Sequence, residues 1–296
     1  MIRFSASEAA LEGFRLTRER PGTIFGWGVV YTVGMFLIGR LMLFSLDPRF
    51  IALTRKSGVT EEDIERVSGL LAQSWPAFLL VLLLVVTLLS TLTAGIYRLV
   101  LRPNERGFLH LRFGRDELRL TGLNLLLFAC GMICLTAEFA TFAIAQQTGG
   151  LGFLAALVLG AITIWLGVRL SLATPMSFAQ HRFAIGDAWR ATRGRFWPLF
   201  GMIVLAVIFY IIVWLLISII GAALVAIAGG PQSLANIQAL TGPAILGIAL
   251  YVFLQLMLQV IQIVMVYAPF AVAYQQLHGG DAADPDEPFL VRARDR

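Results

Sequence analysis

Six apolar blocks, each long enough to cross a bilayer, constrain this chain more than any other feature of its sequence. They cover approximately residues 23–46, 75–98, 120–146, 151–174, 198–228 and 244–268. A transmembrane helix needs about 20 apolar residues. Composition agrees, because 58% of the residues are hydrophobic and 14% are charged, whereas about 25% of residues are charged in soluble domains. We therefore expect an all-α polytopic membrane protein with six transmembrane helices.

Arginine residues lie beside the apolar blocks in a pattern that predicts orientation. Basic stretches at about residues 15–20, 98–119 and 182–195 alternate with neutral or mixed connections. Cytoplasmic loops of membrane proteins carry an excess of Lys and Arg, so this alternation places both termini in the cytoplasm. The same rule accounts for the formal net charge of +5, and we expect no nucleic-acid partner.

A short motif occurs three times, each time ahead of two apolar blocks. Its pattern is an acidic residue, any residue, a large apolar residue, Arg, an apolar residue and Thr, at residues 12–17, 116–121 and 187–192. An acid three residues before an Arg lies on the same helix face and can pair with it. The large apolar residue points to the other face, toward lipid or the bundle, as in a helix that lies in the membrane interface.

The motif predicts three structural repeats within one transmembrane domain at residues 1–274. Each repeat would be a cytoplasmic interfacial amphipathic helix followed by a transmembrane hairpin. The expected modules cover residues 5–101, 102–174 and 178–274. Residues 279–296 are polar and are predicted to form a disordered cytoplasmic tail.

Two local patterns predict details of the first and last modules. A helix is expected at residues 5–20, with Ala10, Leu11 and Phe14 as its apolar stripe. The sixth span is expected to end at Pro269, because proline cannot continue the hydrogen bonding of a helix.

The segment from Arg169 through Pro175 to the run AWRATRGRFWPLFG at residues 188–201 resembles a pattern in bacterial inner-membrane proteins of the YciC-like family. It is also similar to the membrane domain attached to some glycerophosphodiester phosphodiesterases, and the similarity is best over residues 165–205. The resemblance implies a six-helix integral domain of the bacterial inner membrane, in families mostly without assigned activity. It carries no catalytic residues, because the chain has no room for the soluble catalytic domain.

Arginines of the motif are the candidate residues for binding lipid or a protein partner. The candidates are Arg15, Arg119 and Arg190, which share one motif position, and Trp189, Arg193 and Arg195 of the third copy. A planar guanidinium suits two-point contacts to phosphate, so anionic lipid headgroups are the expected partners. A membrane protein or a second copy of the chain, forming a homo-oligomer, is a further possibility. The alternative is that these helices only cap the bundle and fix its topology.

Polar residues inside the apolar blocks are the second group of candidates. Glu138 is the only acidic residue within a predicted span, and such residues are functional-site candidates. Arg40 lies at a similar depth and is its expected ion-pair partner, whereas Arg169 lies nearer the cytoplasm. A polar stripe on the sixth span is formed by Gln255, Gln259 and Gln262. It would either form hydrogen bonds between helices or line a polar path.

No catalytic, phosphate-binding or metal-binding motif is found in the sequence, so no enzyme activity, cofactor or metal is expected. Cys130 and Cys134 are interpreted as small buried residues, and His110 and His181 have no neighbouring Cys or carboxylate cluster. The preferred function is a scaffold or accessory protein that contacts anionic lipid or a protein partner through its cytoplasmic helices. The alternative is a small transporter or lipid-translocating protein with a polar path at Glu138 and the Gln stripe. A hydrated cavity reaching Glu138 would favour the alternative, and a dry, packed core would favour the scaffold.

Overall fold

A computed structural model describes residues 5–45, 60–102, 108–227 and 242–278, and these residues form helices and connections without a strand. Six of the helices are long and apolar enough to cross a membrane, which confirms the prediction of a multi-pass membrane protein. These are α2 (Pro21–Ser45), α5 (Trp75–Leu101), α6 (Arg115–Thr148), α7 (Gly150–Leu170), α10 (Phe196–Ile227) and α12 (Gly242–His278). The shorter helices are α1 (Ala6–Glu19), α4 (Glu61–Gln73), η1 (Phe108–His110), α8 (Ala173–Ala179) and α9 (Ile185–Ala191).

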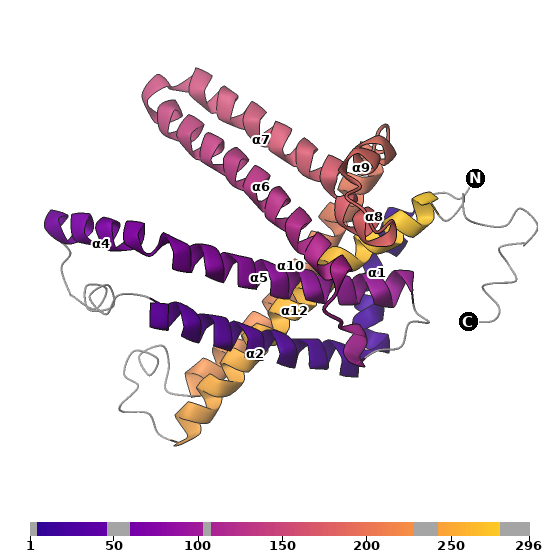
Figure 1. Ribbon diagram of the computed structural model, residues 1–296, viewed down its shortest axis with the longest axis horizontal. Coiled ribbons are helices and arrows are strands. Elements are labelled where there is room, and N and C mark those ends of the chain that lie inside the picture. Colours follow the sequence, from indigo (N-terminus) through magenta and orange to yellow (C-terminus); the bar gives the residue numbers. More distant parts are fainter. Residues whose placement is uncertain (1–4, 46–59, 103–107, 228–241, 279–296) are drawn as a thin grey trace, which may run out of the picture.

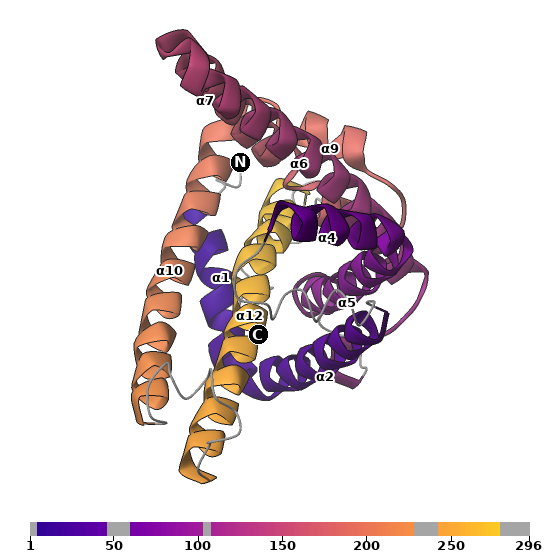
Figure 2. The same cartoon turned by 90° about the vertical axis from the view of Figure 1, so that its left-hand side faces the viewer.

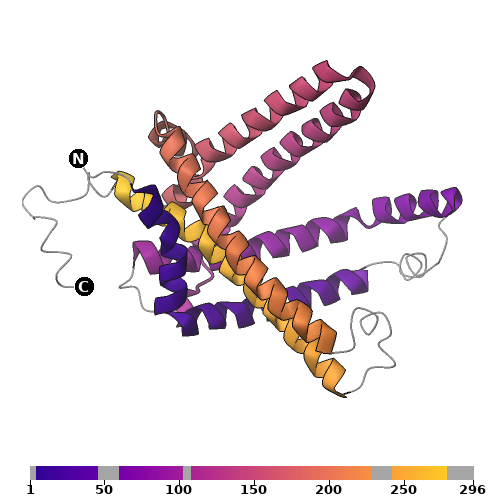
Figure 3. The same ribbon diagram turned by 180° about the vertical axis from the view of Figure 1, so that it is seen from behind.

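The long helices are arranged in three pairs that converge at one end and diverge at the other (Figure 1). The pairs are α2 with α5, α6 with α7, and α10 with α12. Figure 2 shows α1 beside α10 and α12, and Figure 3 shows these last two helices running side by side. We call the converging end the hub; it consists of α1, η1, α8, α9 and the adjoining ends of the six long helices.

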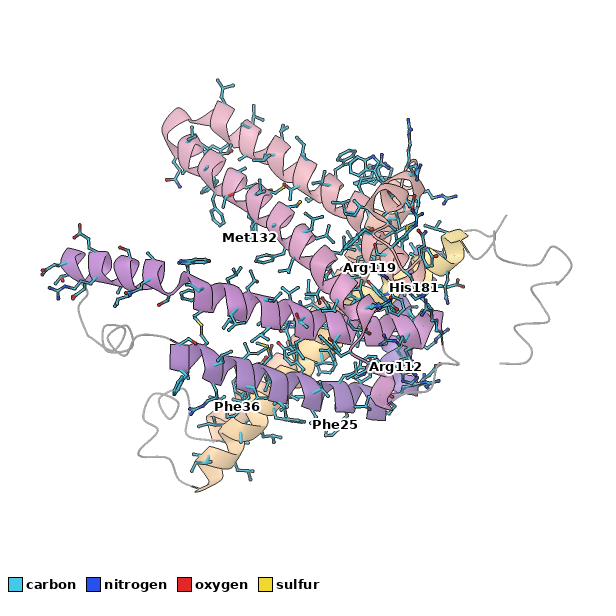
Figure 4. The ribbon with its side chains drawn as sticks, in the orientation of Figure 1. Phe25, Phe36, Arg112, Arg119, Met132 and His181 are labelled. Atoms are coloured by element: carbon cyan, nitrogen blue, oxygen red, sulfur yellow. The ribbon has the colours of Figure 1, made fainter. Side chains whose placement is uncertain are left out.

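The hub contains a core of small and medium apolar residues from several helices. Ala9 of α1, Leu172 before α8, Ala188 of α9 and Met202 of α10 are fully buried together. Away from the hub the long helices expose large apolar side chains, and Phe36 and Met132 project from α2 and α6 in Figure 4. Soluble monomers rarely expose apolar patches of this extent, and such surfaces are typical of contact with lipid.

The predicted interfacial helix is not separate in the second motif copy. Residues 116–121 form the first turns of α6, which continues unbroken from Arg115 to Thr148. In the first and third copies the motif does occupy separate helices, α1 and α9. Pro21 begins a new helix after α1, and Gly194 has a φ of 77° after α9. The second copy has Gly122 in the corresponding region, and this residue stays helical, so nothing there interrupts the chain.

The prediction that the sixth span ends at Pro269 is wrong, because α12 continues through this proline to His278. Contacts with the hub hold the additional turns. Gln275 Nε2 donates a hydrogen bond to the carbonyl of Val100 at 2.9 Å, and the backbone N–H of Ser5 donates to Gln276 Oε1 at 3.2 Å. Burial of this segment therefore outweighs the loss of one helical hydrogen bond at proline.

The buried face of α1 also differs from the predicted apolar stripe. Leu11 and Phe14 are 47% and 37% exposed, whereas Ala10, Gly13 and Leu16 are buried. The reason is close helix packing, since a Cβ atom added to Gly13 would lie 2.7 Å from the Cα atom of Met265 on α12. Only a small residue fits at the position of Gly13, and Leu11 and Phe14 lie at the sides of this approach.

Candidate functional site

The acid–Arg pair predicted for the motif is present in all three copies. Arg15 Nη2 lies 2.9 Å from Glu12 Oε1. Arg119 Nη1 lies 3.0 Å from Asp116 Oδ1. Arg190 pairs with Asp187 in the same i, i+3 arrangement. Each motif arginine is therefore held by a carboxylate on its own helix.

The threonine that ends each motif copy also makes one shared contact. Its hydroxyl donates to the carbonyl four residues earlier, at 2.8 Å in Thr17, 2.9 Å in Thr121 and 2.9 Å in Thr192. The second motif position, which carries Gly13, Glu117 or Ala188, is buried in every copy. The motif thus has one local structure, with its second position against the neighbouring helices.

A different set of hub arginines has no carboxylate partner among the described residues. These exposed side chains are Arg18, Arg20, Arg115, Arg193 and Arg195. Of the candidates predicted from the sequence, only Arg193 and Arg195 belong to this set. Arg193 and Arg195 therefore give the turn between α9 and α10 a positive charge that no carboxylate of the described residues balances.

A buried ion pair joins α5 to α6 and was not found by sequence reasoning. Arg98 pairs with Glu117, and their side chains are 6% and 1% exposed. Glu117 Oε2 also accepts a hydrogen bond from the backbone N–H of Gly114 at 2.9 Å, and Arg98 Nη1 donates to the carbonyl of His110 at 3.1 Å. The motif contained a signal for this pair, because the second copy has the charged Glu117 at the position where the other copies have the small residues Gly13 and Ala188.

Arg169, at the hub end of α7, lies over two tryptophan rings that pack edge to face against each other. Its guanidinium carbon lies 5.4 Å from the ring centroid of Trp165 and 5.0 Å from that of Trp189. Arg169 Nη1 donates to the carbonyl of Trp189 at 3.2 Å, while Arg169 Nε is buried and has no hydrogen-bond partner in the described ranges. Trp189, predicted to contact lipid or a partner, is half-buried and provides a cation–π surface for this arginine.

His181 connects the first and second helix pairs at the surface of the hub, near Arg119 in Figure 4. Arg102 Nη2 lies 2.8 Å from His181 Nε2, and His181 Nδ1 lies 2.8 Å from Asp116 Oδ1. Because Arg102 can only donate, Nε2 accepts and Nδ1 donates to the carboxylate. His110 precedes the second motif copy by the same number of residues as His181 precedes the third. It shares the left-handed backbone conformation, with φ of 57° against 53° at His181.

The ion pair predicted between Arg40 and Glu138 is not formed. Arg40 is exposed on α2 and Glu138 is half-buried on α6, and neither side chain has an ionic partner among the described residues. The helix α5 lies between α2 and α6 (Figure 1). The partly buried Gln stripe of α12, at Gln255, Gln259 and Gln262, makes no hydrogen bond to another described residue.

A cavity of about 660 Å³ lies between α5, α6, α7, α10 and α12. Its wall is mostly apolar and includes Leu127, Ile164 and Phe200, with Cys130 and Cys134 also facing it. Both cysteines are free and half-buried. The cavity wall does not include Glu138 or the Gln stripe. This cavity is therefore distinct from the polar path predicted as the alternative at Glu138 and the Gln stripe.

No group of three or more His, Cys, Asp or Glu residues that could hold a metal ion is found in the part of the chain that the structure describes. No protein-family model, curated protein or solved structure matches the chain. The resemblance to the YciC-like family therefore stays a prediction from the sequence.

Proposed function

We propose that this protein is a scaffold or accessory protein of a bacterial inner membrane, and that its hub contacts anionic lipid headgroups at the cytoplasmic face. The observation that carries the proposal is the charge of the hub. Thirteen hub arginines stand against six acidic residues in the described ranges. The arginines are Arg15, Arg18, Arg20, Arg98, Arg102, Arg112, Arg115, Arg119, Arg169, Arg182, Arg190, Arg193 and Arg195, and the acids are Glu8, Glu12, Glu19, Asp116, Glu117 and Asp187. An excess of arginine at one end of the spans favours the cytoplasmic side.

Aromatic side chains at the hub support its placement at the membrane surface. Phe113, Phe183 and Trp197 are 69%, 59% and 75% exposed. Each lies next to or within two residues of an arginine. Aromatic rings beside cationic groups are typical of the boundary between hydrocarbon and headgroups.

The matching contacts of the three motif copies support the interpretation as an internal repeat. Each copy has the acid–Arg pair, the same threonine contact and a buried second position. All three copies lie in the hub, so the repeat would place three similar helical turns at the cytoplasmic surface, with both termini on that side.

The unpaired arginines are better headgroup contacts than the motif arginines. Arg190 is already paired with Asp187, whereas Arg193 and Arg195 offer their donors without carboxylate competition. An anionic membrane surface attracts each nearby cationic residue by about 1 kcal/mol. We therefore expect Arg193 and Arg195 to give lipid selectivity, and the motif pairs to hold the helices in place.

Lipid analysis of purified variants tests this proposal. Replacing Arg193 and Arg195 together by Gln should lower the share of phosphatidylglycerol and cardiolipin that co-purifies, and the double Lys variant should lose part of it because a point charge lacks the planar fork. Arg190→Lys is the matched control, since its charge and its paired carboxylate are kept. An unchanged lipid profile in the double Gln variant would contradict headgroup binding at this turn.

Orientation is tested separately with single cysteines in a background without Cys130 and Cys134. Ser7 on α1 and Ser68 on α4 are both exposed, and they lie at the hub and at the diverging end. A membrane-impermeant thiol reagent added to intact spheroplasts should label Ser68→Cys and not Ser7→Cys. Labelling of both, or of Ser7→Cys alone, would contradict a cytoplasmic hub.

A further inference from the structure

We propose that the cavity between α5, α6, α7, α10 and α12 holds one acyl chain of a phospholipid from the leaflet on the hub side. The placement of the headgroup at Arg193 and Arg195 rests on the proposed function. The occupancy of the cavity by an acyl chain is supported separately, by the apolar wall and the dimensions of the cavity. The two parts therefore receive separate measurements below.

The cavity wall has too few available polar groups to hold water. Asn124 Nδ2 donates to Ser90 Oγ at 2.8 Å, Ser171 Oγ donates to the carbonyl of Val168 at 2.8 Å, and the hydroxyls of Thr174 and Tyr97 are 2.6 Å apart. A buried water usually makes about three hydrogen bonds. The hydroxyl of Thr163 is the one buried hydroxyl of this wall, among the described residues, without a partner. An apolar occupant is therefore favoured. The hydrocarbon of the lipids around the transmembrane helices can supply it.

The dimensions of the cavity suit an acyl chain of one leaflet. Its wall runs from Thr163 to Ser171 along α7 and from Asn124 to Cys134 along α6. The eight and ten helical steps between these residues correspond to about 12 and about 15 Å at ~1.5 Å per step. Half of the hydrocarbon core is also about 15 Å thick. The volume of about 660 Å³ lies within the usual range of about 300–1,000 Å³ for ligand pockets.

The hub end of the cavity leads toward uncompensated positive charge. Phe200 of α10 forms part of the wall, and Phe196 stacks on it with ring centroids 5.6 Å apart. Arg195 precedes Phe200 by five residues, or about 7.5 Å along the helix axis. Arg193 and Arg195 are exposed and have no carboxylate partner in the described ranges. A phosphate at these arginines and a chain between the helices would match both the charge and the apolar wall.

Two glycines allow the cavity to be filled without displacing the backbone. Gly131 of α6 and Gly167 of α7 line the cavity, and a Cβ atom at either position would meet no other atom within 4 Å. Replacing both by Leu should occupy the space that the chain needs. Gly160→Leu on α7 is the matched control, because its Cβ atom is equally unobstructed and Gly160 does not line the cavity.

The experiment uses the full chain in vesicles of phosphatidylcholine and phosphatidylglycerol that contain a trace of phosphatidylglycerol with a photoreactive diazirine in one chain. A diazirine at the chain end should crosslink near Cys134 and Thr163, and one near the carbonyl should crosslink near Ser171 and Phe200. Crosslinks to these segments should fall by about tenfold, equivalent to ~1.4 kcal/mol, in Gly131→Leu/Gly167→Leu and stay unchanged in Gly160→Leu. Circular dichroism and gel filtration confirm that each variant is folded.

Each outcome decides one part of the proposal. Crosslinks that stay unchanged in the filled variant, or that spread evenly over lipid-exposed residues such as Ile133 and Leu157, would overturn the acyl-chain site. If the chain-end diazirine instead labelled near Ser171 and Phe200, and the diazirine near the carbonyl labelled near Cys134 and Thr163, the lipid would not come from the leaflet on the hub side. The same probe on phosphatidylcholine separates this inference from the proposed function. Equal cavity labelling by both lipids, unaffected by replacing Arg193 and Arg195 with Gln, would retain the chain site and reject headgroup selection.

Discussion

Arg98 near the hub end of α5 and Arg169 near the hub end of α7 lie 71 residues apart, the same separation as the second and third motif copies, but their surroundings differ. Arg98 is buried against the carboxylate of Glu117. Arg169 has no carboxylate partner in the described part of the chain and lies over the rings of Trp165 and Trp189. One arginine is therefore balanced by an opposite charge, and the other is stabilised by the electron-rich faces of two aromatic rings.

The second motif position explains the difference. Glu117 in the second copy faces Arg98, whereas Ala188 at this position in the third copy offers no acceptor and leaves space for the two tryptophans. In the first copy the position is Gly13, which allows α1 to approach α12 closely. One buried position thus determines whether a junction is made by an ion pair, by aromatic rings or by close helix packing.

The largest effect is expected for Glu117→Gln. A buried ion pair that loses one partner leaves an uncompensated charge and costs about 3–5 kcal/mol. Unfolding of the purified protein in mixed micelles measures the loss. Glu62→Gln is the control, because the side chains of Glu62 and Arg66 are 75% and 62% exposed and an exposed pair contributes about 0.2–1 kcal/mol.

A double replacement sharpens this first comparison. Arg98→Leu with Glu117→Leu removes both charges, so the pair should lose less stability than the sum of the single variants. Strictly additive losses would show that the two side chains act independently, and the junction of α5 with α6 would then depend on packing alone.

Gly13→Ala should have the next largest effect. The added methyl group would lie 2.7 Å from the Cα atom of Met265, so α1 must shift from α12. Overpacking of this kind costs about 1–3 kcal/mol. Gly160→Ala, which meets no atom, should instead be neutral or stabilise its helix by about 0.5–1 kcal/mol. Equal behaviour of the two variants in the same unfolding measurement would contradict the close approach at Gly13.

A smaller loss is expected for Trp189→Leu in the third copy. The substitution removes one of the two rings that hold Arg169, and a cation–π contact contributes about 0.5–2 kcal/mol. Trp197→Leu is the matched control, because this ring is 75% exposed and packs on phenylalanines, and no arginine of the described ranges lies over it. If Trp197→Leu lost as much stability as Trp189→Leu, ring area rather than the cation would account for the effect.

The number of long helices and the motif pairs could be predicted because both depend on local sequence. Twenty apolar residues suffice for a span, and residues three apart in a helix are neighbours. The pair of Arg40 with Glu138 was predicted from depth in the membrane. Similar depth in the membrane does not show which helices are neighbours, and α5 separates α2 from α6. For the same reason the pair of Arg98 with Glu117 was missed, since it requires knowledge of which helix ends meet.

The helix boundaries show a second limit of sequence reasoning. Pro269 is a local signal for a helix end, but contacts such as that between Gln275 and Val100 keep α12 helical beyond it. In α1 the apolar stripe was predicted to be Ala10, Leu11 and Phe14, whereas close packing at Gly13 places Ala10, Gly13 and Leu16 on the buried face. Tertiary contacts thus overrule a local preference at both ends of the chain.

The smallest effect is expected from His110, whose buried Nδ1 atom, unlike that of His181, has no hydrogen-bond partner among the described residues. Burial lowers the pKa of His110 below 6.5, and the positive charges of Arg20 and Arg98 lower this pKa further. Between the lowered value and 6.5, the unfolded chain binds more protons than the folded one, so stability falls as the pH falls through this window. His110→Asn tolerates the left-handed backbone and cannot titrate. It should therefore remove part of this acid sensitivity in unfolding measurements above and below pH 6.5.

Glu12 also contributes to the pH dependence of stability. Burial raises the pKa of Glu12, so its contribution to stability changes with pH in the opposite direction, but this contribution cancels when the variant is compared with the wild type. A difference between variant and wild type that stays constant with pH would contradict a titrating His110.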